Sequence, residues 1–255
     1  MDDASLVALA TDLADRAGAE IRAIRNRGFQ VQRKADQSVV TEADRAAEAI
    51  ILAGLRDALP GCTVVAEEEV AGGKITLATR EFWLVDPLDG TREFTGGGDD
   101  FAVNIGLVRD GKPVLGVVGV PATGEMFGGI VGVGAWRRKD GHRTPIAARL
   151  PPAEGLTVVA SRHHGDQAQL DAFLGGRTVA RVVNFGSSLK FCRLAEGQAD
   201  LYPRFGRTME WDTCAPQAVL EAAGGSVETL EGLPLRYGKP GWDNPHFVCW
   251  GARPG

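Results

Sequence analysis

Apolar side chains in the N-terminal part of the chain recur at steps of three and four residues. This spacing is typical of amphipathic helices, because it brings the apolar side chains onto one face. The first such helix is expected to end near Gly28, and its apolar positions are Leu6, Leu9, Leu13, Ala17, Ile21 and Ile24. A second helix is expected to begin at Thr41 and to stop at Pro60-Gly61.

The start of the second helix, Thr-Glu-Ala-Asp at 41–44, resembles a capping box with Asp in the place of Glu. Its buried side chains are expected to be Ala47, Ile50, Ile51 and Leu55. Beyond this helix the apolar period changes to two, which is typical of strands, and strands are expected at residues 63–66, 82–86, 101–109, 114–120, 126–131 and 134–138. Asp110-Gly111 is a strong hairpin signal, and the basic run 137–139 before Asp140-Gly141 is expected at a solvated hairpin tip.

The second half of the chain alternates between the two patterns, which is typical of α/β layering. Strands are expected at 156–160, 178–183 and 199–202, and helices at 166–174, 188–196 and 213–223. The pattern changes at Pro151-Pro152. We therefore predict an N-terminal part (1–150) with a helix pair and a mainly antiparallel sheet, and a C-terminal α/β part (151–255). The fold class is α+β or α/β.

Composition and charge exclude several classes of protein. The formal net charge of −5 argues against a binder of nucleic-acid polymers, which would carry a basic stripe. No integral membrane segment is expected, since no apolar run reaches ~18–20 residues. The acidic start, Met-Asp-Asp, is unlike a signal peptide, so we expect a cytoplasmic protein. Association with the inner membrane surface stays open, as do a monomer and a homodimer. The four cysteines lack C-x-x-C spacing, which predicts reduced, buried or semi-buried thiols.

Four acidic segments are candidates for chemistry: residues 41–44, residues 67–69, residues 86–91 and Trp211-Asp212. Each also has a purely structural interpretation, as a helix cap, a solvated loop or a turn. Asp44 and Asp212, for example, would then serve only the helices in which they lie.

The segment Asp-Pro-Leu-Asp-Gly-Thr at 86–91 favours the chemical interpretation. It follows an apolar strand, and its proline keeps Asp86 extended at the strand end. The Asp-Gly pair then turns the chain, so Asp86 and Asp89 can face one point. The backbone N–H groups of Gly90 and Thr91, at an expected helix start, would form an anion site.

Converging carboxylates need a neutralising partner. Two unit charges 4 Å apart repel by about 4 kcal/mol at an effective dielectric of 20. Oxygen ligands without histidine or cysteine favour Mg²⁺ over Zn²⁺. The residues alone thus predict a magnesium site beside an anion cradle.

Three motifs in this order resemble the Mg²⁺-dependent, lithium-sensitive inositol monophosphatase superfamily: Glu67-Glu68, the segment 86–91, and Trp-Asp-Thr at 211–213. The resemblance covers residues 40–245. It implies the layered α/β/α/β/α sandwich of the inositol monophosphatase and fructose-1,6-bisphosphatase type.

Within this superfamily, Gly-Ser-Ser-Leu-Lys at 186–190, the segment 195–204 and Met-Glu-Trp-Asp at 209–212 are similar to the bacterial 3′(2′),5′-bisphosphate nucleotidase branch. This implies removal of the 3′-phosphate of adenosine 3′,5′-bisphosphate, a by-product of sulfate assimilation, by a metal-activated water. AMP and phosphate would be the products. One alternative is an inositol monophosphatase or a broad sugar-phosphate phosphatase. Another is a catalytically inactive ligand-sensing module, which would be expected to lack a metal ligand.

The resemblance also implies ligand roles for single residues. Glu67, Asp86 and the carbonyl group of Leu88 would hold one Mg²⁺. Asp86, Asp89 and Asp212 would hold a second, and Glu67 would reach a third, weaker ion through water. Two or three Mg²⁺ ions are therefore expected per site. Asp212 would also lie near the leaving oxygen.

For catalysis, the resemblance implies that the N–H groups of Gly90 and Thr91 hold the scissile phosphate. The Thr91 hydroxyl, polarised by Asp44, would orient and deprotonate the attacking water, with Glu67 and Asp212 as the other catalytic residues. Together with Glu67, Leu88, Asp89, Gly90, Thr91 and Asp212, the predicted substrate contacts are Ser161, Arg162, His163, Gly186, Ser187, Lys190 and Arg204. The alternative for Lys190 is a solvated helix lysine.

The sequence departs from the family pattern after Trp-Asp-Thr, where Cys214 and Pro216 replace small residues. If Asp212 caps the last helix, Pro216 falls in the first helical turn, where proline is tolerated. These departures leave every predicted metal ligand in place.

Overall fold

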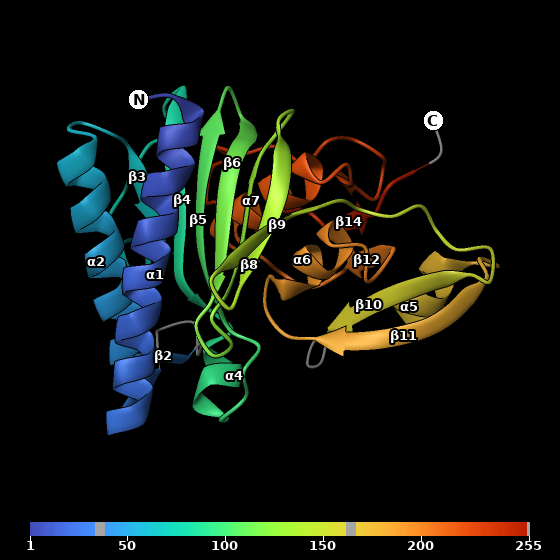
Figure 1. Cartoon of the computed structure of the whole chain (residues 1–255), viewed down its shortest axis with the longest axis horizontal. Coiled ribbons are helices and arrows are strands. Elements are labelled where there is room, and N and C mark those ends of the chain that lie inside the picture. Colours follow the sequence, from blue (N-terminus) through green and yellow to red (C-terminus); the bar gives the residue numbers. More distant parts are fainter. Residues whose placement is uncertain (34–38, 162–166, 254–255) are drawn as a thin grey trace.

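A computed structural model describes residues 1–33, 39–161 and 167–253, apart from the side chains of Ser161 and Gln167. Helices and sheets alternate in layers, from a helix pair on one side to a single helix on the other (Figure 1). This is the α/β/α/β/α sandwich expected from the resemblance, so the predicted fold class is confirmed.

The helix pair consists of α1 (Asp3–Arg27) and α2 (Glu42–Ala58), which lie side by side on the first sheet. Their apolar faces pack into one core with the strands beneath them, as the spacing of three and four predicts. The predicted end of α1 at Gly28 is confirmed. Ile50, predicted on the buried face of α2, is only half-buried.

The first sheet has seven strands in the order β3-β4-β5-β6-β7-β8-β9, and all neighbours are antiparallel except β3 and β4. The strands are β3 (Val64–Ala66), β4 (Glu81–Asp89), β5 (Ala102–Arg109), β6 (Lys112–Val120), β7 (Glu125–Ile130), β8 (Gly134–Lys139) and β9 (His142–Ile146). Both predicted hairpins are present, with positive φ at Asp110-Gly111 and at Asp140-Gly141. Strand β9 was not predicted, because most of its residues are exposed and show no apolar alternation.

A middle layer of two helices, α6 (Leu189–Ala195) and α7 (Glu210–Ala222), lies between the sheets. Helix α7 packs closely on β5 and β6. A Cβ at Gly116 would lie 2.2 Å from the carbonyl oxygen of Ala215, so this close approach requires glycine. The packing of α7 on the first sheet therefore depends on this glycine.

The second sheet has five strands in the order β11-β10-β12-β14-β13. They are β10 (Leu156–Ser161), β11 (Val179–Phe185), β12 (Leu201–Arg204), β13 (Ser226–Thr229) and β14 (Phe247–Trp250). Helix α5 (Gln167–Leu174) covers the outer face, where Leu170 packs with Val158 and Val248. The last two strands were not predicted, although β12, which is equally short, was.

The remaining elements are short: β1 (Val31–Arg33), β2 (Val39–Thr41), α3 (Glu67–Ala71) and α4 (Thr91–Thr95). All four cysteines are free thiols, three of them buried, as predicted. Within the described ranges, no helix is long and apolar enough to cross a membrane. The division of the chain at Pro151-Pro152 stays a prediction.

Candidate active site

The segment 86–91 forms a sharp corner at the end of β4. Pairing of β4 with β5 is irregular between Asp86 and Asp89, which frees the two carboxylates from strict strand alternation. Gly90 follows with φ of 90°, in the left-handed region that favours glycine, and α4 begins at the next residue. A Cβ at position 90 would lie 2.9 Å from the carbonyl oxygen of Asp100. The corner therefore requires glycine for its conformation and for its space.

A pocket lies at this corner and is also lined by α6, β12 and the first turn of α7. It brings together most of the residues predicted from the sequence, namely Glu67, Asp86, Leu88, Asp89, Gly90, Thr91, Ser187, Lys190, Arg204 and Asp212. Residues far apart in the chain thus meet in one place, as the ordered motifs predicted.

Five carboxylates line the pocket: Glu93 and the four that were predicted as metal ligands, Glu67, Asp86, Asp89 and Asp212. Asp86 is buried, and this burial, together with the charges of the other three predicted ligands, raises its pKa well above the usual range. Asp212 is half-buried in the pocket wall, yet the atoms around its carboxyl exclude enough water to raise its pKa. The charges of Asp89 and Glu67 raise it further. Such mutual repulsion is relieved by protons or by a cation.

The donor chemistry fits a hard cation. Among the described residues, no three histidine, cysteine or carboxylate side chains are already arranged as a ligand set. Protein donors hold the carboxylates instead: Oδ1 of Asp86 accepts from the N–H of Leu88 at 3.0 Å, and Oδ2 of Asp212 from the N–H of Met209 at 2.9 Å. Each bond engages one carboxylate oxygen. The second oxygen of each group is of the kind that Mg²⁺ binds together with water.

Thr91 and Asp44 form a hydrogen-bonded pair that joins α4 to the start of α2. The Thr91 hydroxyl lies 3.1 Å from Oδ1 of Asp44 and 3.1 Å from the carbonyl oxygen of Leu88. Oδ2 of Asp44 accepts from the N–H and the hydroxyl of Thr41, which completes the predicted capping box. Asp44 is buried, which raises its pKa even though these hydrogen bonds lower it. One carboxylate thus serves the helix start with one oxygen and reaches Thr91 with the other.

The Gly-Ser-Ser turn at 186–188 is tied directly to Asp89. Ser187 has φ of 54°, and its hydroxyl donates to Oδ2 of Asp89 at 2.6 Å. The N–H of Ser188 donates to the same oxygen. The second half of the chain is therefore joined to the corner through a carboxylate of the pocket.

Two supports of this turn were not predicted from the sequence. Asn104, a fully buried residue of β5, accepts from the Ser188 hydroxyl at 2.8 Å. Asp100 accepts from the N–H of Gly186 at 2.9 Å. The only signal for Asn104 was a polar side chain within an otherwise apolar strand, which requires a hydrogen-bond partner. Asp100 lies in a loop and gave no such signal.

Two basic side chains, Lys190 and Arg204, line the part of the pocket formed by the second half of the chain. Lys190 is 6% exposed, so the alternative of a solvated lysine is wrong. Its ammonium donates to the carbonyl oxygen of Ser187 at 2.5 Å, and burial lowers its pKa to about 8. Arg204 donates to the carbonyl oxygen of Arg207 at 3.1 Å, whereas its buried Nε has no hydrogen-bond partner within the described residues. Positive charge and an unused donor suit a phosphate group.

Some predicted contacts are not among the pocket residues. Arg162 and His163 lie outside the described residues, and so does the side chain of Ser161. Gly186 precedes the lining residue Ser187 and does not itself line the pocket. The predicted roles of these four residues therefore stay predictions.

The last helix was expected at 213–223, with an Asp212 cap as one interpretation, but it begins three residues earlier and Asp212 is not its cap residue. Helix α7 begins at Glu210 after the cap residue Met209, and Asp212 is the third helical residue, with its side chain directed back to the cap. Pro216 consequently lies inside the helix instead of in its first turn. The apolar period could not place this start, because the first turn contains two carboxylates.

Comparison with known proteins finds relatives along nearly the whole chain. The sequence model of the inositol monophosphatase family matches residues 2–246. The 3′(2′),5′-bisphosphate nucleotidase CysQ of Escherichia coli (strain K12) is 46% identical over 209 residues, which are 82% of this chain and 83% of that protein. The crystal structure of CysQ from Bacteroides thetaiotaomicron has a TM-score of 0.81 at 34% identity and covers 98% of both chains. An inositol monophosphatase from Anabaena (Nostoc) sp. PCC 7120 has a TM-score of 0.77 at 27% identity, with 97% of this chain and 91% of that chain covered.

Proposed function

Because the chain belongs to the inositol monophosphatase family, we propose that it is a cytoplasmic, Mg²⁺-dependent 3′(2′),5′-bisphosphate nucleotidase. It would remove the 3′-phosphate of adenosine 3′,5′-bisphosphate and leave AMP and phosphate. One observation carries the proposal: a single pocket joins the four carboxylates predicted as metal ligands to two basic side chains of the second half of the chain, Lys190 and Arg204. The likeness to the nucleotidases named CysQ supports the same substrate.

The candidate substrates differ in the number of phosphates that they carry. Adenosine 3′,5′-bisphosphate carries two, so one can be cleaved at the carboxylate side while the other pairs with fixed positive charge. Inositol monophosphate carries one, and its binding would leave the buried Nε of Arg204 without a partner. A site built for a polar group discriminates strongly against a ligand that lacks that group.

We propose that Glu67, Asp86 and the Leu88 carbonyl hold one Mg²⁺ ion and that Asp86, Asp89 and Asp212 hold a second, for a total of two or three. When bound, the ions would neutralise phosphoryl oxygens and make a water molecule more acidic. Hydrolysis of a phosphate monoester requires an acceleration approaching ~10²¹. A side-chain acid or base supplies only about 10²–10⁴, so the main task of the carboxylates is to hold cations.

At the corner, the N–H groups of Gly90 and Thr91 would bind oxygens of the scissile phosphate. The Thr91 hydroxyl lies 3.1 Å from Oδ1 of Asp44 and can donate its proton there while its oxygen accepts from the attacking water. The raised pKa of Asp44 suits a group that takes up a proton. The Thr91–Asp44 pair would therefore orient the water and remove its proton.

In the part of the pocket that the second half of the chain lines, Lys190 and Arg204 would bind the second phosphate. Ser187, whose carbonyl oxygen accepts from the Lys190 ammonium, also lines the pocket. We propose Ser161, Arg162, His163 and Gly186 as further contacts of the nucleotide.

The proposal is tested with a phosphate-release panel on the whole chain, with Mg²⁺, without it, and with added Li⁺. The substrates are adenosine 3′,5′-bisphosphate, adenosine 3′-monophosphate and inositol 1-phosphate. We expect the highest kcat/KM for the bisphosphate, no release without Mg²⁺ and inhibition by Li⁺. The monophosphate is the matched control, since it differs only by the 5′-phosphate.

A preference for inositol 1-phosphate would overturn the substrate assignment in favour of an inositol monophosphatase. Tight binding of the bisphosphate without phosphate release in millimolar Mg²⁺ would instead indicate a ligand-sensing module.

A further inference from the structure

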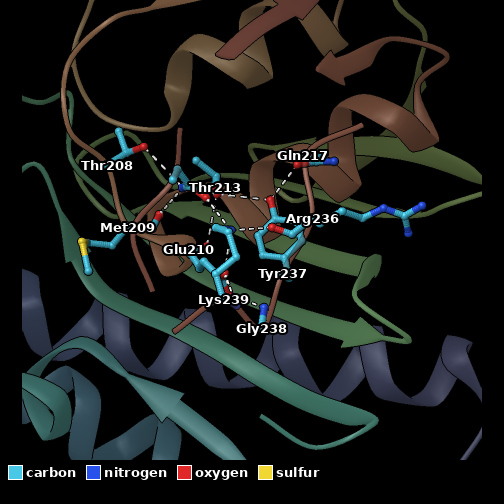
Figure 2. A network of polar contacts seen from close by, with 10 residues as sticks. Thr208, Met209, Glu210, Thr213, Gln217, Arg236, Tyr237, Gly238 and Lys239 are labelled. Atoms are coloured by element: carbon cyan, nitrogen blue, oxygen red, sulfur yellow. Dashed lines mark hydrogen bonds and ion pairs between the residues drawn. The ribbon is translucent and has the colours of Figure 1, made fainter. Parts of the chain in front are cut away.

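A network of buried polar contacts surrounds the first turn of α7 (Figure 2) and, among the described residues, touches the pocket lining only at Thr208, Asp212 and Thr213. Its centre is Glu210, which is fully buried and stands two residues before Asp212. Oε2 of Glu210 accepts from the N–H of Gly238 at 2.7 Å. Oε1 accepts from the N–H of Lys239 at 2.9 Å and from the Lys239 ammonium at 2.6 Å. The carboxylate of Glu210, which does not line the pocket, is thus held by three donors from Gly238 and Lys239.

Asn244 is the second centre of the network. Its Nδ2 donates to the carbonyl oxygen of Met209 at 2.8 Å and to the hydroxyl of Thr213 at 3.0 Å. Its Oδ1 accepts from the Lys239 ammonium at 3.2 Å, which links it to Glu210. Met209 is also the residue whose N–H holds the carboxylate of Asp212. The network therefore reaches Asp212 through its cap residue.

Backbone contacts tie the same two segments together. The N–H of Glu210 donates to the carbonyl oxygen of Trp242 at 2.8 Å, and the N–H of Asn244 donates to that of Thr208 at 2.9 Å. Met209 pairs with residue 243 in an antiparallel bridge. Residues 236–244, called the 236–244 clamp below, are thus fastened to the first turn of α7.

The first turn of α7 requires such fastening because of Pro216. Proline has no N–H, so residue 216 cannot donate the i→i−4 helical bond to the carbonyl oxygen of Asp212. One of the bonds that would connect this turn to the rest of the helix is therefore missing. Beyond the turn, Ala215 is held against β5 and β6 by the close approach of Gly106 and Gly116. The part of α7 that carries Asp212 depends on contacts from outside the helix.

We propose that Glu210, with Lys239 and Asn244, is a positioning device that keeps Asp212 turned toward the other carboxylates of the pocket. The inference rests on the proposed function, since it takes Asp212 as a ligand of Mg²⁺. Glu210 acts through Met209 and Asp212 and is not a catalytic residue. Outer partners of metal ligands, when removed, weaken metal binding or activity by about 10–100-fold.

The chain offers a matched control in Asp200. This carboxylate is 1% exposed, is bound by Arg149 at 2.8 and 3.0 Å and accepts from the N–H of Thr157 at 2.7 Å. It has the same kind of partners as Glu210, but it does not line the pocket. Glu210→Gln and Asp200→Asn should therefore both lower the thermal unfolding temperature. Only Glu210→Gln should also weaken the binding of Mg²⁺ in the pocket.

The test is calorimetric titration of the whole chain with Mg²⁺ alone, at a temperature where each variant is folded. We expect Glu210→Gln and Lys239→Met to weaken Mg²⁺ binding by about 10–100-fold. Lys239→Arg, which keeps the charge, should retain most of the affinity, and Asp200→Asn should bind as the unaltered chain does. Phosphate release from adenosine 3′,5′-bisphosphate, measured in parallel, should require correspondingly more Mg²⁺ in the first two variants.

Unchanged Mg²⁺ affinity in Glu210→Gln and Lys239→Met, with lowered thermal stability alone, would overturn the proposal and leave a purely structural network. If Glu210→Gln does not fold, Lys239→Met decides, because the Lys239 side chain is 30% exposed and tolerates replacement more readily. If the unaltered chain binds Mg²⁺ but does not cleave the bisphosphate, the proposed function fails while the titration still decides the positioning role. Absence of Mg²⁺ binding in the unaltered chain would overturn both.

Discussion

Two regions supply the carboxylates of the pocket, and they are held in different ways. The corner at 86–91 is fixed by its own segment: an interior strand of a seven-stranded sheet, an irregularity in that strand and a left-handed glycine. The first turn of α7 is fixed from outside, by a clamp whose side-chain and backbone contacts span 28 to 36 positions. A local motif is enough to specify the first region. The position of the second region depends on contacts between segments that meet only in the folded chain.

The largest expected effect comes from Asp89→Asn at the corner. Asparagine can still accept from Ser187 and Ser188, so the turn at 186–188 should keep its structure, while the negative charge is lost. We expect the rate of phosphate release to fall at least about 1,000-fold, or about 4 kcal/mol of activation free energy. The Mg²⁺ concentration for half-maximal rate should rise as well. Both quantities follow from rates measured across a Mg²⁺ series.

The double variant, with both Asp89→Asn and Asp212→Asn, tests whether the two regions act on the same ion. Asp212→Asn alone, in the α7 region, should show a loss similar to that of Asp89→Asn. Because the two residues are proposed to hold one ion, the double variant should lose little more than either single one. Losses that multiply would mean that the two regions serve separate functions.

The fold could be predicted from the sequence where one face of an element is buried. The period of three and four placed α1 and α2, and the period of two placed β5 and β6 with their turn. The prediction failed where the element is short or exposed, as in β9 and β13, since no apolar period exists there. It also failed at the start of α7, because buried carboxylates replace the apolar signal.

The site could be predicted as far as its residues lie in motifs. The turn that Asp86 and Asp89 make is encoded by the Pro and Gly of the same segment, so the residues themselves indicated a corner. Asn104 and Glu210 could not be found in this way. Their partners, Ser188 and Lys239, come from other parts of the chain, and a single sequence carries no record of such a pairing.

An intermediate effect, on the stability of the fold, is expected from replacing Glu48, which binds the first turn of α3. Glu48 accepts from the N–H of Glu68 at 2.7 Å, and burial raises its pKa from 4.5 to about 7. Between these values the unfolded chain has released a proton that the folded chain keeps, so stability falls as the pH rises. This contribution is complete below pH 4.5 and is lost as the pH passes 7, with a span of up to about 3 kcal/mol.

Glu48→Gln should remove that dependence. Denaturant unfolding of both proteins across pH 4.5 to 8 gives the difference in unfolding free energy, which should shift in favour of the variant as the pH rises. Other carboxylates titrate in both proteins and cancel in the difference. A pH-independent difference would contradict the raised pKa. Mg²⁺ affinity should change less than in Glu210→Gln, if the corner is held mainly by its own segment.

The smallest expected effect is that of Arg204→Gln, and it separates binding from reaction. Arg204 lies in β12, which precedes α7 in the sequence, and its buried Nε has no hydrogen-bond partner in the part of the chain that the structure describes. Arg204 also lines the pocket. Losing one charged hydrogen bond to the second phosphate should raise KM for adenosine 3′,5′-bisphosphate about tenfold. The kcat value, set at the corner, should stay the same, and so should KM for adenosine 3′-monophosphate. Arg80→Gln, in an exposed pair with Asp110, removes the same charge away from the pocket and should change neither constant. A lower kcat with an unchanged KM in Arg204→Gln would show that the α7 side takes part in the reaction itself, and the division between the two regions would then be wrong.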